Sequence, residues 1–265
     1  MINKIFKENF KIIIIILLIF ILILLFLINK ICNNESSLNY YIYDSNKPGK
    51  TIAIIGGTHG NEPIGSIVIK NLIEKINKKE ITLKSGKLIL IPDVNYCALR
   101  IGIRMIPSIG DINRKYPKNI YDKSNCPINN KIINLLNNAD FVLDFHEGWG
   151  FHRLNKKSMG SSITPTDSVL SNDIANYLYN QINLTITDPK KKFIIFVNDD
   201  RYIKNPLKYS QLNDIKGSLR YYQNINNKNY VLIEITGQNN IQTLDIRIQQ
   251  ANTILKSTLS YFKII

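Results

Sequence analysis

The chain contains few of the residues that cross-link proteins or bind metals. Its 265 residues include only three cysteines, three histidines and one tryptophan. Three cysteines are too few for a disulfide scaffold, so the fold must depend on a hydrophobic core. The chain has no internal repeat either, which argues against a repeat architecture. Because histidine is so rare, His59 and His146 are informative where they stand beside carboxylate residues.

Long basic runs are also missing, although the net charge is +14, from 34 Lys and Arg against 20 Asp and Glu. Such an excess is compatible with nucleic acid, anionic lipid or an acidic substrate. However, only three lysines cluster, at 190–192, and basic residues do not interleave with aromatic ones. Ile, Asn and Lys are all abundant, as a strong A+T codon bias would produce. We therefore interpret the charge as background and expect no nucleic-acid partner.

One long apolar run lies near the N-terminus. Ile12–Ile28 has 17 apolar residues, which is at the low end of what crosses a bilayer core. Three lysines precede it, so the positive-inside rule favours a cytosolic N-terminus and an extracytosolic remainder. The alternative is a cleaved signal peptide, but this run is long and residues 29–32 contain no small-residue cleavage site. We predict a short basic N-terminus (1–11) and a single-pass signal anchor (12–28).

A polar linker (29–39) and one domain (40–265) are expected after the anchor, since about 220 residues suit one α/β domain. Expected strands are 40–43, 51–55, 87–91, 141–143, 193–197 and 230–235, and expected helices are 64–75, 128–136, 169–182 and 241–262. Strands that alternate with helices predict an α/β fold, a mixed sheet in three layers with helices on both faces.

Polar residues follow two of the expected buried strands. Gly56-Gly57 ends the strand 51–55, and Pro63 is typical of the first turn of a helix. His59 and Glu62 therefore lie on a strand-to-helix turn, where open α/β sheets bind ligands. His146 is expected just beyond the end of the strand 141–143. Two histidines and a carboxylate suit a catalytic zinc site with one position left for water.

These segments resemble the zinc carboxypeptidase superfamily, and more closely its succinylglutamate desuccinylase/aspartoacylase branch. The resemblance runs from about residue 50 to the C-terminus. It rests on five elements in order, His59-x-x-Glu62, Arg104, Asn113-Arg114, His146 and Glu234. It implies a carboxypeptidase-like fold and one zinc ion per chain, held by His59, Glu62 and His146.

The same resemblance implies roles for the other residues. Asn113 and Arg114 would grip the carboxylate of the substrate, since a guanidinium matches a carboxylate bidentately. Arg104 would polarise the scissile carbonyl, with Arg100 as a competing candidate. Glu234 would be the general base, and a carboxylate in the middle of an apolar strand needs such a reason.

Simpler interpretations exist for several residues. Asn113-Arg114 would also suit an ordinary helix cap followed by a surface charge. Glu147 and Trp149 are expected at the rim of the site, although Trp149 would equally suit plain packing. His152 is expected to be a pocket or surface residue rather than a ligand.

The spacing of the motifs leaves the reaction open. The short gap between Glu62 and His146 suits the deacylase branch. In contrast, Gly217-Ser218-Leu219 precedes Glu234 at the spacing of the carboxypeptidase specificity segment. This spacing places Leu219 at the side-chain pocket and predicts an apolar terminal residue, whereas Arg220 beside it would suit an acidic one.

The sequence differs from these families in two further ways, both in its C-terminal part. Leu212 stands where carboxypeptidases carry a tyrosine on a mobile loop, and Tyr209 is a candidate substitute. Only 31 residues follow Glu234, too few for the C-terminal β-domain of aspartoacylases.

Three functions remain compatible with the sequence. The first is a membrane-anchored metallocarboxypeptidase, the second an N-acyl-amino-acid deacylase, and the third an inactive binding module. For either enzyme the partner is a peptide or N-acyl amino acid with a free carboxylate. If the domain is extracytosolic, Cys97 can pair with Cys126, and Asn34 and Asn183 lie in glycosylation motifs.

Overall fold

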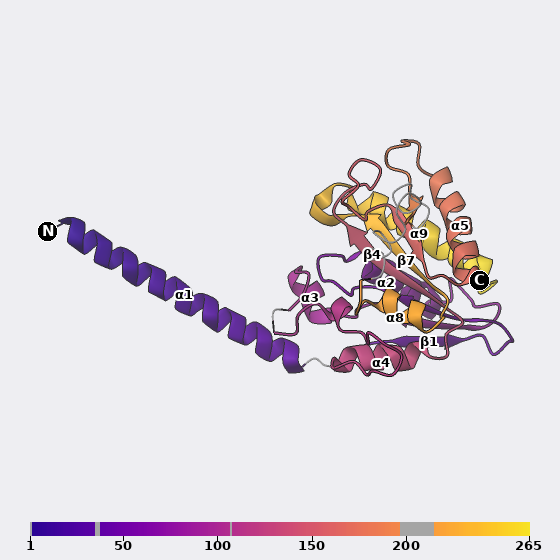
Figure 1. Cartoon of the computed structure of the whole chain (residues 1–265), viewed down its shortest axis with the longest axis horizontal. Helices are drawn as coiled ribbons and strands as arrows, with labels where there is room; N and C mark the ends of the chain where they lie inside the picture. The colour runs from indigo at the N-terminus through magenta and orange to yellow at the C-terminus, as the bar shows by residue number, and fades with distance from the viewer. Residues whose placement is uncertain (1, 35–37, 107, 197–214) are drawn as a thin grey trace.

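The computed structural model describes residues 2–34, 38–106, 108–196 and 215–265. A long N-terminal helix, α1 (Ile2–Asn34), projects away from the rest of the chain (Figure 1). Within it, Asn9–Leu27 is long and apolar enough to cross a membrane, and the side chains of residues 12–27 are exposed. The expected span is therefore a helix whose side chains are not covered by the described part of the domain. The helix also continues past residue 28, so residues 29–34 of the expected linker are helical.

A seven-stranded mixed sheet lies at the centre of the described domain, in the order β1-β3-β2-β4-β7-β5-β6. Its strands are β1 (Tyr41–Asp44), β2 (Thr51–Ile55), β3 (Lys87–Ile91), β4 (Phe141–Gly148), β5 (Ser162–Pro165), β6 (Ile194–Ile195) and β7 (Tyr230–Thr236). β3, β2, β4 and β7 run parallel, whereas β1 and β5 pair antiparallel with β3 and β7. The central strands are apolar on both faces, as strands covered on both sides must be.

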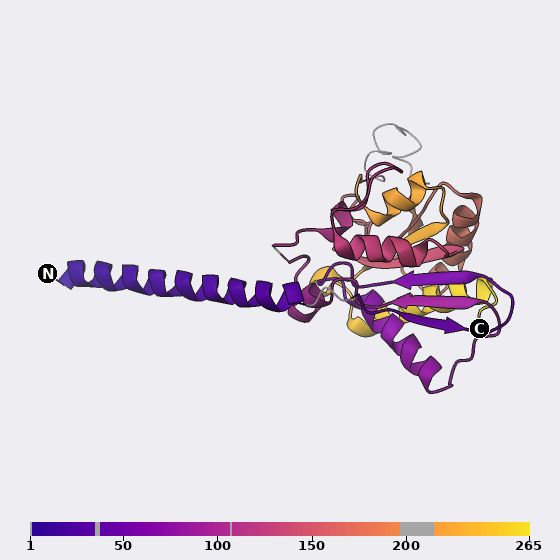
Figure 2. The same cartoon turned by 90° about the horizontal axis from the view of Figure 1, so that it is seen from below.

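Helices cover both faces of this sheet (Figures 1 and 2). One face packs against α2 (Ile64–Asn77), α5 (Val169–Leu184) and α9 (Leu244–Tyr261) in the larger hydrophobic core. The other face packs against α4 (Pro127–Leu136) and α8 (Leu219–Ile225) in a second core. The predicted three-layer arrangement is confirmed. Three shorter helices complete the described domain, α3 (Tyr96–Ile101), η1 (Ile112–Arg114) and η3 (Gln238–Asn240).

Regular apolar patterns predicted most elements, but β4 is longer than expected. β2 and β3 have the predicted bounds. β4 continues to Gly148 because β7 pairs with it as far as Thr236. The prediction that His146 lies just beyond its strand is therefore wrong, since this residue lies inside β4.

Three of the elements lacked a sequence signal. β5 is a four-residue strand with Ser, Thr and Pro in it, while α3 and α8 have only six and seven residues. The expected strand 193–197 is reduced to Ile194–Ile195 in β6, and Val197 lies outside the described residues.

The cysteine pairing differs from the predicted one. Cys32, near the end of α1, forms a disulfide with Cys97 on α3, with 5.6 Å between their Cα atoms. Cys126 is free and buried at the start of α4. The expected Cys97–Cys126 disulfide is therefore wrong.

Asn183 is not accessible as a glycosylation site. Its side chain is buried on α5 and makes two hydrogen bonds to Phe193, accepting from the backbone N–H and donating to the carbonyl. A glycan would break both, so this expectation is wrong too. The side chain of Asn34 lies outside the described part of the chain.

Cysteine alkylation tests this pairing. Iodoacetamide should label no cysteine in the folded chain, one after denaturation and all three after denaturation with reduction. Cys126 should be the one labelled without reductant, because it is free but buried. Mass spectrometry of the labelled peptides is the measurement, with Cys126→Ser as the control that removes the intermediate step. A disulfide-linked peptide that contains Cys126 would contradict the structure.

Candidate metal centre and active site

Parallel strands bring the predicted site residues to one edge of the sheet. β2 ends at Ile55, and the turn that follows carries His59 and Glu62 before α2 begins. His146 on β4 lies directly opposite Glu234 on β7 in the strand register. Side chains directly opposite each other on neighbouring strands point to the same face of the sheet. The sheet therefore brings these groups together at the carboxyl ends of its central strands.

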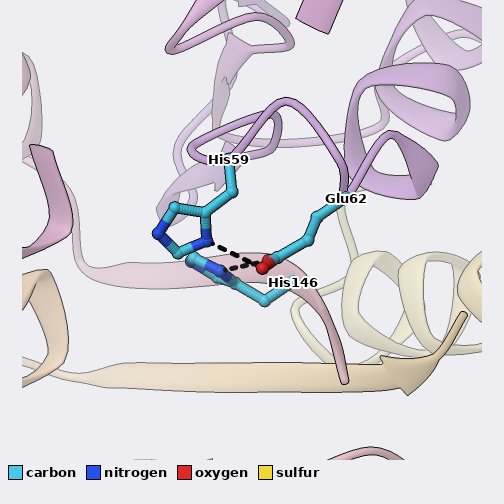
Figure 3. Close-up of side chains that lie close together, drawn as sticks. All are labelled: His59, Glu62 and His146. Atoms are coloured by element: carbon cyan, nitrogen blue, oxygen red, sulfur yellow. Dashed lines mark hydrogen bonds and ion pairs between the residues drawn. The ribbon is translucent and has the colours of Figure 1, made fainter. Parts of the chain in front are cut away.

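His59, Glu62 and His146 form the centre of the site, and all three are buried. The ligand atoms that they offer lie within 4.8 Å of one another. Both imidazoles turn Nδ1 toward the Glu62 carboxylate, at 2.9 Å from His59 and 2.8 Å from His146 (Figure 3). Yet His59 Nδ1 makes no hydrogen bond, although it is buried and next to Glu62. Potential ligand atoms gathered this closely are typical of residues that share a metal ion.

Each imidazole has a carboxylate on its far side. His59 Nε2 lies 3.2 Å from Asp111 Oδ1, and His146 Nε2 lies 3.5 Å from Asp144 Oδ2. Asp144 also accepts a hydrogen bond from the hydroxyl of Tyr230, at 2.7 Å. Carboxylates behind ligating histidines fix the ring orientation and raise the basicity of the metal-binding nitrogen. The residues present therefore fit a zinc ion with two imidazole ligands and one carboxylate ligand.

Charge interactions hold Glu62 ionised. Burial favours its neutral form, but the interactions with His146 and His59 outweigh burial and keep the pKa of Glu62 well below its ordinary value. Burial also opposes a charge on His146, whereas Asp144 and Glu62 raise the pKa of this histidine well above its usual value. A divalent cation would replace such a proton between these groups, since metal binding competes with protons for the same ligands.

Glu234 has the opposite electrostatic environment. Burial, with the nearby charge of Glu62, raises its pKa to about 8. A general base works best with a pKa near the operating pH, so this carboxyl group is suited to both accepting and returning a proton. It lines the same cavity of about 210 Å³ as the three candidate ligands.

Arg104 points into the site. Its guanidinium contacts Glu62 Oε1 and Asp111 Oδ2, at 3.0 Å each, and it lines the cavity. The competing candidate, Arg100, lies on α3, with its guanidinium 5.7 Å from the ring centroid of Tyr96. Of the two arginines, Arg104 is the one that lines this cavity.

Asn113 and Arg114 also line the cavity, on the short helix η1. Asn113 accepts a hydrogen bond from the backbone N–H of Leu219, at 2.9 Å, through Oδ1. The side-chain NH2 of Asn113 can therefore donate a hydrogen bond to a substrate. Gly217 lies against the backbone of Arg114, where a Cβ would be 2.4 Å from the carbonyl oxygen, so η1 and the start of α8 are closely packed. The simple helix-cap interpretation of the Asn-Arg pair does not explain this shared cavity.

Leu219 does not lie at the predicted position. Its side chain is 1% exposed and packs in the core between α4 and the sheet. It belongs to the first turn of α8, which the sequence did not reveal as a helix. Its neighbours Ser218 and Arg220 line the cavity instead, and Arg220 donates two hydrogen bonds to the carbonyl of Pro165. The prediction that Leu219 forms the side-chain pocket is therefore wrong.

The expectations for the rim are met in part. Trp149 is 41% exposed and lines the cavity, as does Glu147. Glu147 is itself buried, accepts from the backbone N–H of Ile64 at 2.8 Å and pairs with Arg247 at 2.7 Å. His152 is fully buried and its Nδ1 lies 2.7 Å from the carbonyl oxygen of Ser158. It is neither a surface residue nor one of the cavity residues, so its expected position is wrong.

Sequence reasoning gave no role to the residues behind the ligands. Asp111 is two residues before Asn113, and Asp144 is two residues before His146 on one strand, which places Asp144 and His146 on the same face. That spacing was a usable signal. Gln238, which donates to Glu62 Oε1 at 3.1 Å, comes from the turn after β7 and had none. Leu212 and Tyr209 lie outside the described residues.

Comparison with known proteins supports the resemblance. The family described as succinylglutamate desuccinylase/aspartoacylase catalytic domain matches residues 48–152. This range contains all of the expected site residues except Glu234 and Leu219. No curated protein matches the chain. The match covers 105 of the 265 residues and includes the predicted His59-x-x-Glu62 and Asn113-Arg114 motifs and His146, so it agrees with the predicted resemblance over this part of the chain.

Solved structures share the fold. Tripeptide-bound cell shape determinant Csd4 from Helicobacter pylori has a TM-score of 0.69 at 17% identity, over 86% of this chain and 56% of that one. The mDAP-bound form of Csd4, a D,L-carboxypeptidase, gives 0.64 at 17% identity, over 82% and 52%. A succinylglutamate desuccinylase from a Silicibacter species gives 0.55 at 22% identity, over 85% and 60%. The chain thus spans a little over half the length of these structures, and such identities show the fold alone.

Zinc affinity tests the ligand set. His146→Ala should abolish stoichiometric zinc binding, because it removes one of three ligands. Asp111→Asn and Asp144→Asn should each weaken binding by about 10–100-fold, the cost of losing a partner behind a ligating histidine. Chelator competition on the purified chain measures all three. The exposed Asp122→Asn serves as the matched control, and equal affinities in all variants would contradict the assignment.

Proposed function

We propose that this relative of the succinylglutamate desuccinylase/aspartoacylase family is a membrane-anchored zinc metallohydrolase that cleaves an amide bond next to a free carboxylate. Within this class, it is a metallocarboxypeptidase. The observation that carries the proposal is the register of β4 and β7, which sets Glu234 directly opposite the candidate ligand His146. A candidate base thereby shares one cavity with a complete ligand set.

The residues divide the work of hydrolysis between them. His59, Glu62 and His146 would hold zinc, which supplies Lewis acidity and lowers the pKa of a bound water. Glu234 takes the proton of the attacking water and later gives it to the leaving amine, as its raised pKa allows. Arg104 already contacts the candidate ligand Glu62. Its guanidinium offers N–H groups to the oxyanion that develops on the scissile carbonyl.

Two residues of η1 would orient the substrate. The guanidinium of Arg114 and the free amide NH2 of Asn113 line the cavity, and together they can hold one carboxylate by charge-assisted hydrogen bonds. A carboxylate held there would fix the adjacent amide relative to Glu234. Positioning of this kind lowers the entropic part of the barrier.

A metallocarboxypeptidase is favoured by the fold comparison, because the two Csd4 structures give higher TM-scores than the desuccinylase does. An N-acyl-amino-acid deacylase is the second candidate, favoured by the matched catalytic-domain family. A binding module without activity is third, since both the base and the ligand positions are filled.

The disulfide supports an extracytosolic catalytic domain. Disulfides persist in oxidising compartments and are rare in the cytosol. Cys97 lies in the catalytic domain and Cys32 follows the candidate span, so both belong to the side on which the domain lies. This side agrees with the orientation that the N-terminal lysines favour.

Removal of the base tests the chemistry. Glu234→Gln should keep the fold and bound zinc but reduce kcat by about 10²–10⁴-fold, the usual contribution of a general acid–base group. Zinc content and turnover are measured on the same sample, with C-terminal peptides and N-acyl amino acids as substrates. Glu80→Gln is a suitable control, because this glutamate lies outside the cavity. Turnover near that of the wild type would mean that another group transfers the proton.

Removal of the Arg114 guanidinium tests substrate recognition. Arg114→Ala should reduce kcat/KM for free-acid substrates by a factor equivalent to about 1.5–3 kcal/mol, the contribution of a hydrogen bond to a charged group, since Arg114 is exposed in the free chain. Amidated analogues should be poor substrates of both forms and lose little further. Lys118→Ala, which removes an exposed cation four residues along, should change neither. A wild-type enzyme that cleaves free-acid and amidated substrates equally well would rule out the exopeptidase mechanism.

A further inference from the structure

The disulfide fixes the depth of α3 relative to the candidate membrane span. The span ends at Leu27, and Cys32 is five residues further along the same helix. Five residues of α-helix rise about 7–8 Å. The polar headgroup layer on each side of the hydrocarbon core is about 5–7 Å thick. Cys97, bonded to Cys32, must therefore lie at or just above the lipid headgroups once the helix crosses a bilayer.

Packing holds the neighbouring segment at the same place. Cys32 contributes to a small buried cluster with Ala98 and Ile106, which lie on α3 and beyond the loop that follows it. Figures 1 and 2 both show α3 beside the C-terminal end of α1. The chain between these contacts is short, so residues 96–106 as a whole lie near the end of the span.

This segment exposes an unusual number of large apolar side chains for its length. Tyr96, Ile101, Ile103 and Met105 are 37–42% exposed. Ile101 is four residues after Cys97, so the two share one side of α3. The guanidinium of Arg100 lies over the ring of Tyr96, at 5.7 Å. Tyrosine and arginine with apolar neighbours are typical of the membrane–water interface, where an apolar body and a polar tip are both accommodated.

We propose that Tyr96–Met105 is a second membrane contact, which places its apolar side chains among the lipid headgroups on the side of the catalytic domain. The inference rests on the proposed anchor. The partner is a lipid bilayer, because the disulfide and the length of α1 bring this segment to the interface.

The contact lies next to the candidate active site. Arg104 stands between Ile103 and Met105 but turns its guanidinium inward, to Glu62 and Asp111. Gly60, on the ligand-bearing turn, packs so closely that a Cβ would be 2.0 Å from the carbonyl oxygen of Ala98. The proposed membrane contact and the candidate metal centre are therefore packed directly against each other.

Fluorescence quenching by brominated lipid tests this contact in the full chain. Trp149→Phe removes the single natural tryptophan, and one reporter is then added at a time. The reporters are Ile103→Trp and Met105→Trp in the segment, Phe20→Trp inside the span and Leu184→Trp on α5. The vesicles are phosphatidylcholine without bromine, with bromine on the acyl-chain carbons nearest the headgroup, or with bromine near the ends of the acyl chains.

We expect emission from the reporter at position 20 to fall about two-fold or more with bromine near the chain ends, because seven residues of helix put it about 10 Å inside the span. Emission from the reporters at positions 103 and 105 should fall as much with bromine near the headgroup, because the proposed contact puts them at the boundary between headgroups and acyl chains. The reporter at position 184 is 81% exposed at the end of α5. Because this helix is distant from α1 in both views, the emission of this reporter should not change. Quenching at position 20 without quenching at 103 or 105 would overturn the second contact but leave the anchor. No quenching at position 20 would overturn the anchor and this contact together. Blue-shifted but unquenched emission at 103 and 105 would mean that a protein covers the segment, which also overturns the proposal.

Discussion

The Glu62 carboxylate is 3% exposed, and a charge so far from water must be compensated by its neighbours. Four separate segments supply that compensation. His59 comes from the same turn, His146 from β4, Arg104 from the loop after α3 and Gln238 from the turn after β7. The arrangement requires β2, β4 and β7 to end together, so the topology of the sheet and the compensation of one charge depend on each other. A divalent cation among these ligands would complete it.

The site residues that could be predicted from the sequence are those that belong to a short, local sequence pattern. The His59–Glu62 spacing, the apolar run with Glu234 in it and the Asn113-Arg114 pair all sit beside regular elements, and the structure brings them to one cavity. Leu219 was misplaced because its role was taken from a spacing, whereas the first turn of α8 points it into the core. The chain alone gives no signal for such a rotation.

Long-range contacts account for the other differences. The Cys32–Cys97 disulfide joins residues 65 positions apart, and no local pattern favours it over Cys97–Cys126. β4 extends past its apolar run because β7 pairs with it, and β5 depends in the same way on its pairing with β7. The long apolar helix, by contrast, was predictable, since an apolar run of that length needs no partner to be recognised. Its disulfide to α3 adds that the candidate metal centre lies close to the proposed membrane surface.

The central claim is that His59, Glu62 and His146 bind one catalytic zinc ion, and anomalous X-ray diffraction tests it most directly. Crystals of the full chain, purified in detergent with zinc, would be measured on both sides of the zinc absorption edge. The account predicts one anomalous peak per chain, about 2.0–2.2 Å from Nδ1 of each histidine and from a carboxylate oxygen of Glu62. A peak held by other residues, or no peak in crystals of zinc-saturated protein, would contradict it.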